Sequence, residues 1–265
     1  MKQDNQKSFT LLELLVVIAI IAILAGIVMV AVSDSRERAK QAKGLQFSQN
    51  IRTTLSNELV GEWTFDSNTI KENPIGSGIF YAQDTSGNGN HGRIYGDPQN
   101  PRGITRECLE FNGNDYIQIP NTPSLTLSGS NESVFLWVKH NNSDYIFFQS
   151  NGWSRRLFKN YWAFYSPFTT FQLGNSHDNN WHLVGYTASG QTIKSYLDGD
   201  LLETKNITLS SSIGYWWLGR ICSGSTCDNY YNGYIDEVRI YNRALTAKEV
   251  QQLYAKSLPR HLSSK

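Results

Sequence analysis

The sequence predicts a mainly β protein, with a long N-terminal membrane-spanning α-helix followed by a β-sandwich of two sheets. Two observations carry this prediction. Phe9–Val32 is a continuous apolar run of 24 residues, which is typical of a membrane helix. From Leu59 to Tyr254 the chain changes to short apolar runs separated by Gly, Asn, Asp and Ser, which indicates strands joined by turns.

The apolar run is long enough to cross a membrane. Its one ionisable side chain is Glu13, and 24 residues rising about 1.5 Å each reach roughly 36 Å, against a bilayer core of about 30 Å. A secretory signal peptide usually has an apolar run of only about 7–15 residues. Lys2 and Lys7 make the leader weakly basic, which favours a cytoplasmic N-terminus. We therefore expect a single-pass protein of the cytoplasmic (inner) membrane with an extracytoplasmic head.

Glu13 distinguishes this segment from a plain membrane anchor, which is the alternative. A carboxylate at the centre of a membrane helix costs about 2.5–3.5 kcal/mol, and such residues tend to mark a functional pairing. The stretch KSFTLLELL, beginning at Lys7, closely resembles the processing motif of type IV pilins and type II secretion pseudopilins. Ser8 stands where that family normally has Gly.

The pilin resemblance implies processing and assembly. A prepilin peptidase would cut between Ser8 and Phe9 and methylate the new amine, and Glu13 would pair with the N-terminus of a neighbouring subunit. The implied partners are the membrane, other pilin-like subunits and their assembly machinery, in a pilus or a secretion pseudopilus.

The helix is expected to continue beyond the membrane. Phe47, Ile51 and Leu55 recur every four residues in a segment without Pro, which places them on one helix face. The predicted organisation is a leader at residues 1–8, a helix at 9–57 with its membrane part at 9–32, a β-sandwich at 58–254 and a flexible tail at 255–265.

Several local patterns support the sandwich. Asp198-Gly199 stands between two alternating segments, which is a strong hairpin signal. Val134–Val138 is continuously apolar, as expected of a strand that is covered on both faces. The clearest predicted strands are Tyr116–Ile119, Ser133–Lys139, Trp181–Thr187, Ile193–Leu197, Tyr215–Leu218 and Tyr234–Tyr241.

Seven short motifs follow one another along the predicted sandwich: GEWTFD from Gly61, DTSGNGNHG from Asp84, LEFNGNDYI from Leu109, VFLWVK from Val134, WH at Trp181, YLDG from Tyr196 and GYIDEVRIYNRAL from Gly233. Taken in this order, they resemble the laminin G-like (LamG) family with its concanavalin A-like jelly roll. The resemblance covers most of Val60–Tyr254 and implies a two-sheet jelly-roll sandwich. Thr246 and Glu249 form a capping box that begins a final helix.

Two places suggest a structural cation such as Ca²⁺, which prefers six to eight oxygen ligands. The oxygen-rich loop Asp84–Asn90 is either a cation site or an ordinary turn. The apolar positions around Asp236 fit no regular strand, so we expect a β-bulge there. The LamG resemblance then implies a Ca²⁺ site made by Asp66, Asp236 and the carbonyls of Asn112 and Gly113.

The acidic residues do not predict an enzyme. Glycoside hydrolysis generally needs a pair of carboxyl groups, and jelly-roll glucanases carry Glu-x-Asp-x-x-Glu on one strand. The nearest pairs, Glu107 with Glu110 and Asp236 with Glu237, lack that spacing. The histidines are scattered, and His182 at a strand start suggests a structural role.

Aromatic residues are the better functional indication. Tyr145–Phe171 holds eleven of them in 27 residues, and strand alternation should bury about half. Trp153, Trp162 and Tyr165 are the candidate ligand-binding residues, because flat rings suit stacking on sugars.

The cysteines and the net charge give two further predictions. Cys222 and Cys227 could close a small disulfide loop, with Cys108 unpaired, although three cysteines allow three single bridges. A formal net charge of +1 gives no electrostatic indication of nucleic-acid binding.

Taken together, these patterns favour a pilin-like subunit displaying a polysaccharide- or cell-surface-glycan-binding, adhesive head. The alternatives are a membrane-tethered glycan-active enzyme and a purely structural pseudopilin.

Overall fold

The computed structural model describes Leu11 and residues 14–22, 55–104, 106–140, 148–150, 155–158, 161–164, 169–174, 178–209, 214–223 and 226–257. The chain divides into two compact units, Met1–Thr54 and Leu55–Lys265. In the first unit, residues 14–22 are helical and exposed. Within the described ranges, no helix combines the length and apolar character needed to cross a membrane. Ser8, Phe9, Glu13 and most of the predicted membrane segment lie outside these ranges.

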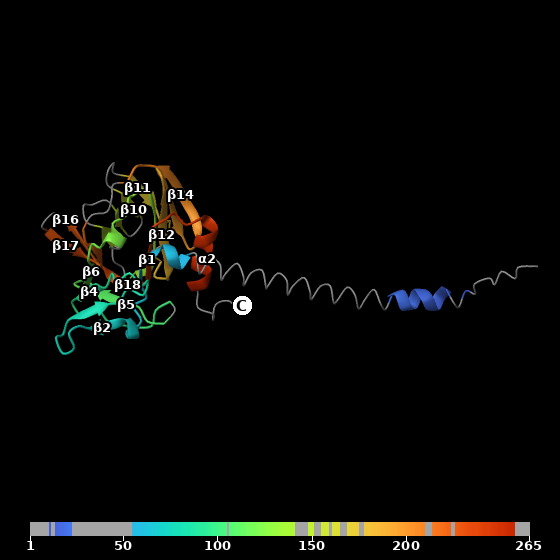
Figure 1. Cartoon of the computed structure of the whole chain (residues 1–265), viewed down its shortest axis with the longest axis horizontal. Helices are drawn as coiled ribbons and strands as arrows, with labels where there is room; N and C mark the ends of the chain where they lie inside the picture. The colour runs from blue at the N-terminus through green and yellow to red at the C-terminus, as the bar shows by residue number, and fades with distance from the viewer. Residues whose placement is uncertain are drawn as a thin grey trace, which may run out of the picture. The chain divides into compact units, whose positions relative to one another are not determined.

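Among the described residues, the second unit is a sandwich of a seven-stranded and a nine-stranded sheet, accompanied by a two-stranded hairpin (Figure 1). The first sheet has the order β1-β18-β7-β12-β13-β14, with β5 also paired to β18. Its strands are β1 (Leu59–Trp63), β5 (Leu109–Asn112), β7 (Asn131–His140), β12 (His182–Ser189), β13 (Thr192–Leu197), β14 (Asp200–Asn206) and β18 (Asn232–Tyr241).

The second sheet has the order β11-β10-β9-β8-β15-β6-β4-β3-β2. Its strands are β2 (Ile70–Glu72), β3 (Phe80–Ala82), β4 (Gly92–Tyr95), β6 (Tyr116–Ile119), β8 (Phe148–Ser150), β9 (Arg155–Leu157), β10 (Tyr161–Phe164), β11 (Thr169–Gln172) and β15 (Trp216–Leu218). The hairpin consists of β16 (Arg220–Ser223) and β17 (Thr226–Tyr230), and the helical elements are η1 (Ser67–Thr69), η2 (Pro123–Leu125) and α2 (Ala247–Ser257).

Strand β7 is covered on both faces, as its apolar run predicts. Val134, Leu136 and Val138 belong to the main core between the sheets. Phe135 and Trp137 point the other way, into a second cluster that includes residues of α2. Alternation along a strand sends successive side chains to opposite faces, so a strand between two apolar layers is apolar at every position.

Helix α2 covers the outer face of the seven-stranded sheet and packs beside β14 (Figure 1). Val250 and Leu253 are buried in the second cluster. The predicted capping box is confirmed, since the Glu249 backbone N–H donates to Thr246 Oγ1 at 3.3 Å and the Thr246 N–H donates to the Glu249 carboxylate at 2.8 Å. Two otherwise unpaired backbone donors are thereby satisfied.

The predicted hairpin and bulge are also present. Asp198 and Gly199 have φ values of 52° and 87°, and two positive values in a two-residue loop define the turn that suits the strand twist. The register between β18 and β7 shifts between Asp236 and Arg239, and Glu237 has a φ of 50°. This bulge re-aims the side chains at the centre of β18.

Candidate ligand-binding face

The outer face of the nine-stranded sheet carries a group of partly exposed aromatic side chains. Ile117 and Leu218 lie in the main core, and Ile94 packs against it. Because strand side chains alternate, their neighbours Tyr95, Tyr116 and Trp217 point to the opposite, outer face, and each is only partly buried.

The outward rings form a connected group. Tyr95 and Tyr116, opposite each other on β4 and β6, stack with centroids 4.5 Å apart. Trp217 lies 5.9 Å from Tyr116, and Tyr215 lies 5.8 Å from Trp217. Tyr230, from the β16–β17 hairpin, lies 6.3 Å from Tyr116. Tyr215 is 46% exposed, so the group reaches solvent.

Two arginines lie over these rings. The Arg220 guanidinium carbon is 3.5 Å from the Tyr116 centroid and 4.0 Å from that of Trp217. Arg93 lies 4.6 Å from the Tyr95 centroid. These are cation–π distances. Burial raises the pKa of the Tyr116 hydroxyl, which therefore stays neutral and remains a hydrogen-bond donor.

A buried carboxylate holds the strand ends that carry Tyr95 and Tyr116. Asp115 is fully buried. Its two oxygens accept the backbone N–H of Asp97 at 2.9 Å and that of Asn112 at 3.0 Å. Since Asp97 follows β4 and Asp115 precedes β6, this one side chain sets the relative position of the two stacked rings.

The structure describes one of the three ligand-binding residues predicted from the sequence. The prediction for Trp162 is wrong: its side chain is fully buried in the main core, with its ring edge-on to Tyr186 at 4.9 Å, so it cannot stack on a ligand. Trp153 and Tyr165 lie outside the described residues. Sequence reasoning missed Tyr95 and Tyr116, although the alternation around each of them could have indicated an outward ring.

The predicted cation ligands are not gathered in one place. Asp236 is buried, and its oxygens accept the N–H groups of Ile104 at 2.9 Å and Glu237 at 2.8 Å. Burial, followed by the charges of Glu237 and Asp66, raises the pKa of Asp236 to about 8. Asn112 lies opposite Asn232, four residues from Asp236, or about 13 Å along the strand.

Strand register therefore separates Asn112 and the following Gly113 from Asp236. The charge of Asp66, in contrast, acts on Asp236 and raises its pKa. In the described part of the chain, no group of three or more His, Cys, Asp or Glu has a metal-binding arrangement.

The loop at Asp84–Asn90 is internally hydrogen-bonded. One Asp84 oxygen accepts the N–H groups of Glu62 at 3.0 Å and Ser86 at 2.9 Å, and the other accepts that of Asn90 at 2.9 Å. Asn90 is fully buried, and its amide donates to the Val60 carbonyl. The Asp84 oxygens thus bind backbone donors, as in a turn.

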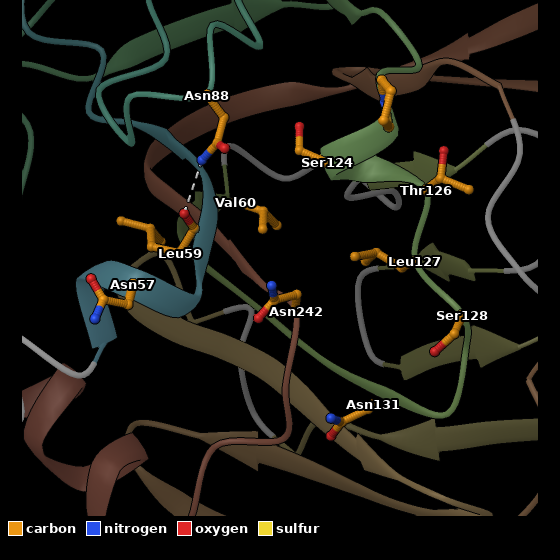
Figure 2. A pocket seen from close by; sticks show the side chains of 11 residues that line it. Asn57, Leu59, Val60, Asn88, Ser124, Thr126, Leu127, Ser128, Asn131 and Asn242 are labelled. Carbon is orange, nitrogen blue, oxygen red and sulfur yellow. Dashed lines mark hydrogen bonds between the residues drawn. The ribbon is translucent and has the colours of Figure 1, made fainter.

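A cavity of about 500 Å³ opens beside this loop (Figure 2). The amides of Asn57, Asn88, Asn131 and Asn242 line it, together with hydroxyls from residues 124–128. Asn88 turns its amide to the Leu59 carbonyl at 3.1 Å. The described lining residues include no charged and no aromatic side chain, so they can hydrogen-bond a neutral group but cannot stack on one.

His182 has the structural role that the sequence suggests. Its Nδ1 lies 2.7 Å from Asp198 and its Nε2 lies 2.9 Å from Asp178. The hydrogen bond with Asp198 is the main cause that raises the pKa of His182. Asp198 also accepts the Leu183 N–H at 2.9 Å, which ties the β13–β14 turn to the start of β12.

Cys108 is free and buried, and burial raises its thiol pKa to about 12. Cys227 is disulfide-bonded. The side chain of Cys222 lies outside the described residues, so its pairing with Cys227 stays a prediction, which non-reducing peptide mapping would test.

Two family models match the chain. Residues 111–251 match the model described as the concanavalin A-like lectin/glucanases superfamily. Residues 3–29 match the prokaryotic N-terminal methylation motif.

Three solved structures are similar to this chain. Domain 4 of AbnA, a GH43 extracellular arabinanase from Geobacillus stearothermophilus solved with arabinotriose, is 20% identical, with a TM-score of 0.55 over 74% of this chain and 98% of that chain. The ligand-binding domain of botulinum neurotoxin serotype D, solved with N-acetylneuraminic acid, is 15% identical, with a TM-score of 0.60 over 78% and 52%. The binding domain of Paraclostridial Mosquitocidal Protein 1 is 18% identical, with a TM-score of 0.59 over 76% and 53%.

The chain thus spans about half the length of the two toxin domains, and at these identities the likeness shows the fold alone. The lectin/glucanase model covers more than half of the chain. The chain therefore belongs to the concanavalin A-like lectin/glucanases superfamily, with a laminin G-like domain that follows a prokaryotic N-terminal methylation motif.

Proposed function

We propose that this chain is a pilin-like subunit whose laminin G-like head binds a glycan and acts in adhesion. The methylation motif indicates a membrane-anchored or pilus-associated location. The head has a lectin-type fold, and two of its structural neighbours were solved with sugars. Fold alone does not assign a ligand, so the proposal rests on the outer face.

The supporting observation is the group of rings at Tyr95, Tyr116, Tyr215 and Trp217. The main core uses the opposite face of the same strands, so interior packing does not account for these outward rings. Tyr95 and Tyr116 stack on each other and each has an arginine over its ring, so Tyr215 and Trp217 offer the flat apolar area for the C–H faces of sugars. Several connected rings suit a chain of sugar units.

Adjacent tryptophans provide a matched test. Trp217→Ala should lower the affinity of the full chain, in detergent, for the polysaccharide that it binds, with little change in the thermal midpoint. Trp216→Ala, its core neighbour on the inner face, should cost about 3–5 kcal/mol of stability. Binding is screened on immobilised polysaccharides. Unchanged affinity in folded Trp217→Ala would exclude this face as the glycan site.

A glycan-active enzyme and a purely structural pseudopilin are the other candidate functions. We propose that the head is not an enzyme, because its acidic residues lack the glucanase spacing. Release of reducing sugar at catalytic amounts of protein would support the enzyme instead. Failure to bind any polysaccharide would favour the structural role.

We also propose that a Ca²⁺ ion stabilises the fold of the head. Asp66 and Asp236 are the two predicted ligands that influence each other electrostatically, and a divalent cation beside them would favour the ionised carboxylates. The thermal midpoint should then rise in CaCl₂ and fall in a chelator. An equal thermal midpoint in CaCl₂ and in chelator would exclude a structural Ca²⁺ ion.

A further inference from the structure

A row of cationic and aromatic side chains crosses the outer face of the nine-stranded sheet. Cross-strand register places Lys71 on β2 opposite Tyr81 on β3, and Tyr81 opposite Arg93 on β4. The row continues from Arg93 to Gln118 on β6 and then to Trp217 on β15. With adjacent strands about 4.8 Å apart, the five positions span about 19 Å.

The row contains no carboxylate. Among the described residues, no ion pair involves Lys71, Arg93 or Arg220. This distinguishes them from Arg155, Arg239 and Arg243, which pair with glutamates. The outer face therefore has a local positive charge on a chain whose formal net charge is only +1.

The two arginines are held in position without a charged partner. Tyr116 and Trp217 contact the Arg220 guanidinium, and Tyr95 contacts that of Arg93. The Nε of both arginines is shielded from solvent and has no hydrogen-bond partner in the described structure. A guanidinium fixed by aromatic rings loses little entropy when it binds a carboxylate in a fork geometry.

We propose that this face binds an acidic glycan, one whose sugar rings carry carboxylates. Arg93 and Arg220 pair with those carboxylates, Lys71 extends the positive row, and the rings contact the sugar faces. The inference rests on the proposed glycan-binding function and specifies its ligand class. A charge-complementary surface of this length fits an extended oligosaccharide better than a single sugar.

The test compares one polymer in two charge states. The full chain in detergent is titrated with oligomers of polygalacturonate and with the same oligomers after carboxyl reduction to the neutral sugar. We expect the wild type to bind the acidic form about tenfold tighter, with an affinity that falls as NaCl is raised. Arg220→Gln and Arg93→Gln should each reduce this preference.

Three control variants show whether a lost preference for the acidic polymer reflects these arginines rather than a general loss of positive charge or unfolding. Lys194→Gln, on β13 of the other sheet, removes one positive charge and should leave the preference unchanged. Arg220→Lys keeps the charge without the fork and should retain only part of the preference. Among the described rings, Arg93 is placed over that of Tyr95 alone, so Arg93→Gln serves if Arg220→Gln unfolds.

Equal binding of both polymers, or a preference that survives both glutamine variants, would overturn the acidic-glycan assignment and leave glycan binding intact. Binding to no polysaccharide at all would overturn the proposed function as well. Equally tight, arginine-dependent binding to phosphatidylglycerol vesicles would replace the glycan with a membrane surface and also overturn the inference.

Discussion

At the scale of single residues, the surroundings of Asp236 strongly change the acidity of its carboxyl group. The bulge in β18 turns it into the interior, where it lies so close to Gly103 that a side chain at that position would have no room. Two backbone N–H groups hold its oxygens. Burial and the charges of Glu237 and Asp66 outweigh them and raise its pKa to about 8.

Asp236 should therefore make the fold less stable as pH rises. An ordinary Asp loses its proton near pH 4 when unfolded, whereas the folded group keeps it up to about pH 8. Between these values the folded state binds more protons, so stability falls with increasing pH and levels off above about pH 8. Thermal midpoints from pH 4 to pH 9 in chelator should show this decline.

Asp236→Asn provides the control for that decline. The variant is less stable overall, because its NH₂ group faces a backbone donor, but its profile should be flatter. His182 titrates in both proteins, so its contribution cancels in the difference. Parallel profiles for the two proteins would contradict the prediction.

At the scale of elements, Gly219 joins β15 to the β16–β17 hairpin and so places Arg220 over the rings of β6 and β15. Its φ is 84°, and a Cβ there would lie 2.5 Å from the Phe111 ring and 2.8 Å from the Asp115 carbonyl. The turn thus requires glycine for its backbone conformation and for close packing.

Gly219→Ala should cost about 2–4 kcal/mol, from a left-handed backbone and an overpacked contact. Gly113→Ala is the matched control, because Gly113 has a φ of 96° but nothing within 4 Å of the added Cβ, and it should lose only about 1–2 kcal/mol. Urea unfolding measures both. Equal losses would show that contact with Phe111 has no part in the cost.

At the scale of the whole molecule, the matched methylation motif makes Glu13 the expected assembly residue. Glu13→Val should still insert into the membrane, because the change removes a cost of up to about 2.5–3.5 kcal/mol. It should not enter a filament, because it lacks the carboxylate that pairs with the neighbouring N-terminus. Co-purification with sheared filaments measures incorporation, and normal incorporation would contradict the prediction.

Ser8 tests the processing step separately. Ser8→Gly should speed cleavage before Phe9, because it restores the residue that the pilin family normally has there. Mass spectrometry of the membrane-extracted chain reports the N-terminus. An intact leader in both proteins would mean that the segment only anchors the head.

The sequence by itself determined the two-sheet class, the Asp198-Gly199 hairpin, the bulge at Asp236 and the cap at Thr246. The two-sheet class follows from the succession of short strands and from the laminin G-like motifs, whereas the hairpin, the bulge and the cap are each encoded within a few neighbouring residues, through side-chain alternation or turn chemistry. For the same reason the sequence showed that β7 is covered on both faces.

The tertiary structure decided which aromatic residues reach the surface. Alternation makes Trp216 and Trp217 point in opposite directions, but only the second sheet determines which of them is buried, and the same packing places Trp162 in the core. Arg220 reaches Tyr116 across 104 positions of sequence, and register separates Asn112 from Asp236. Such contacts depend on how strands pair and layers stack, which no short stretch of sequence specifies.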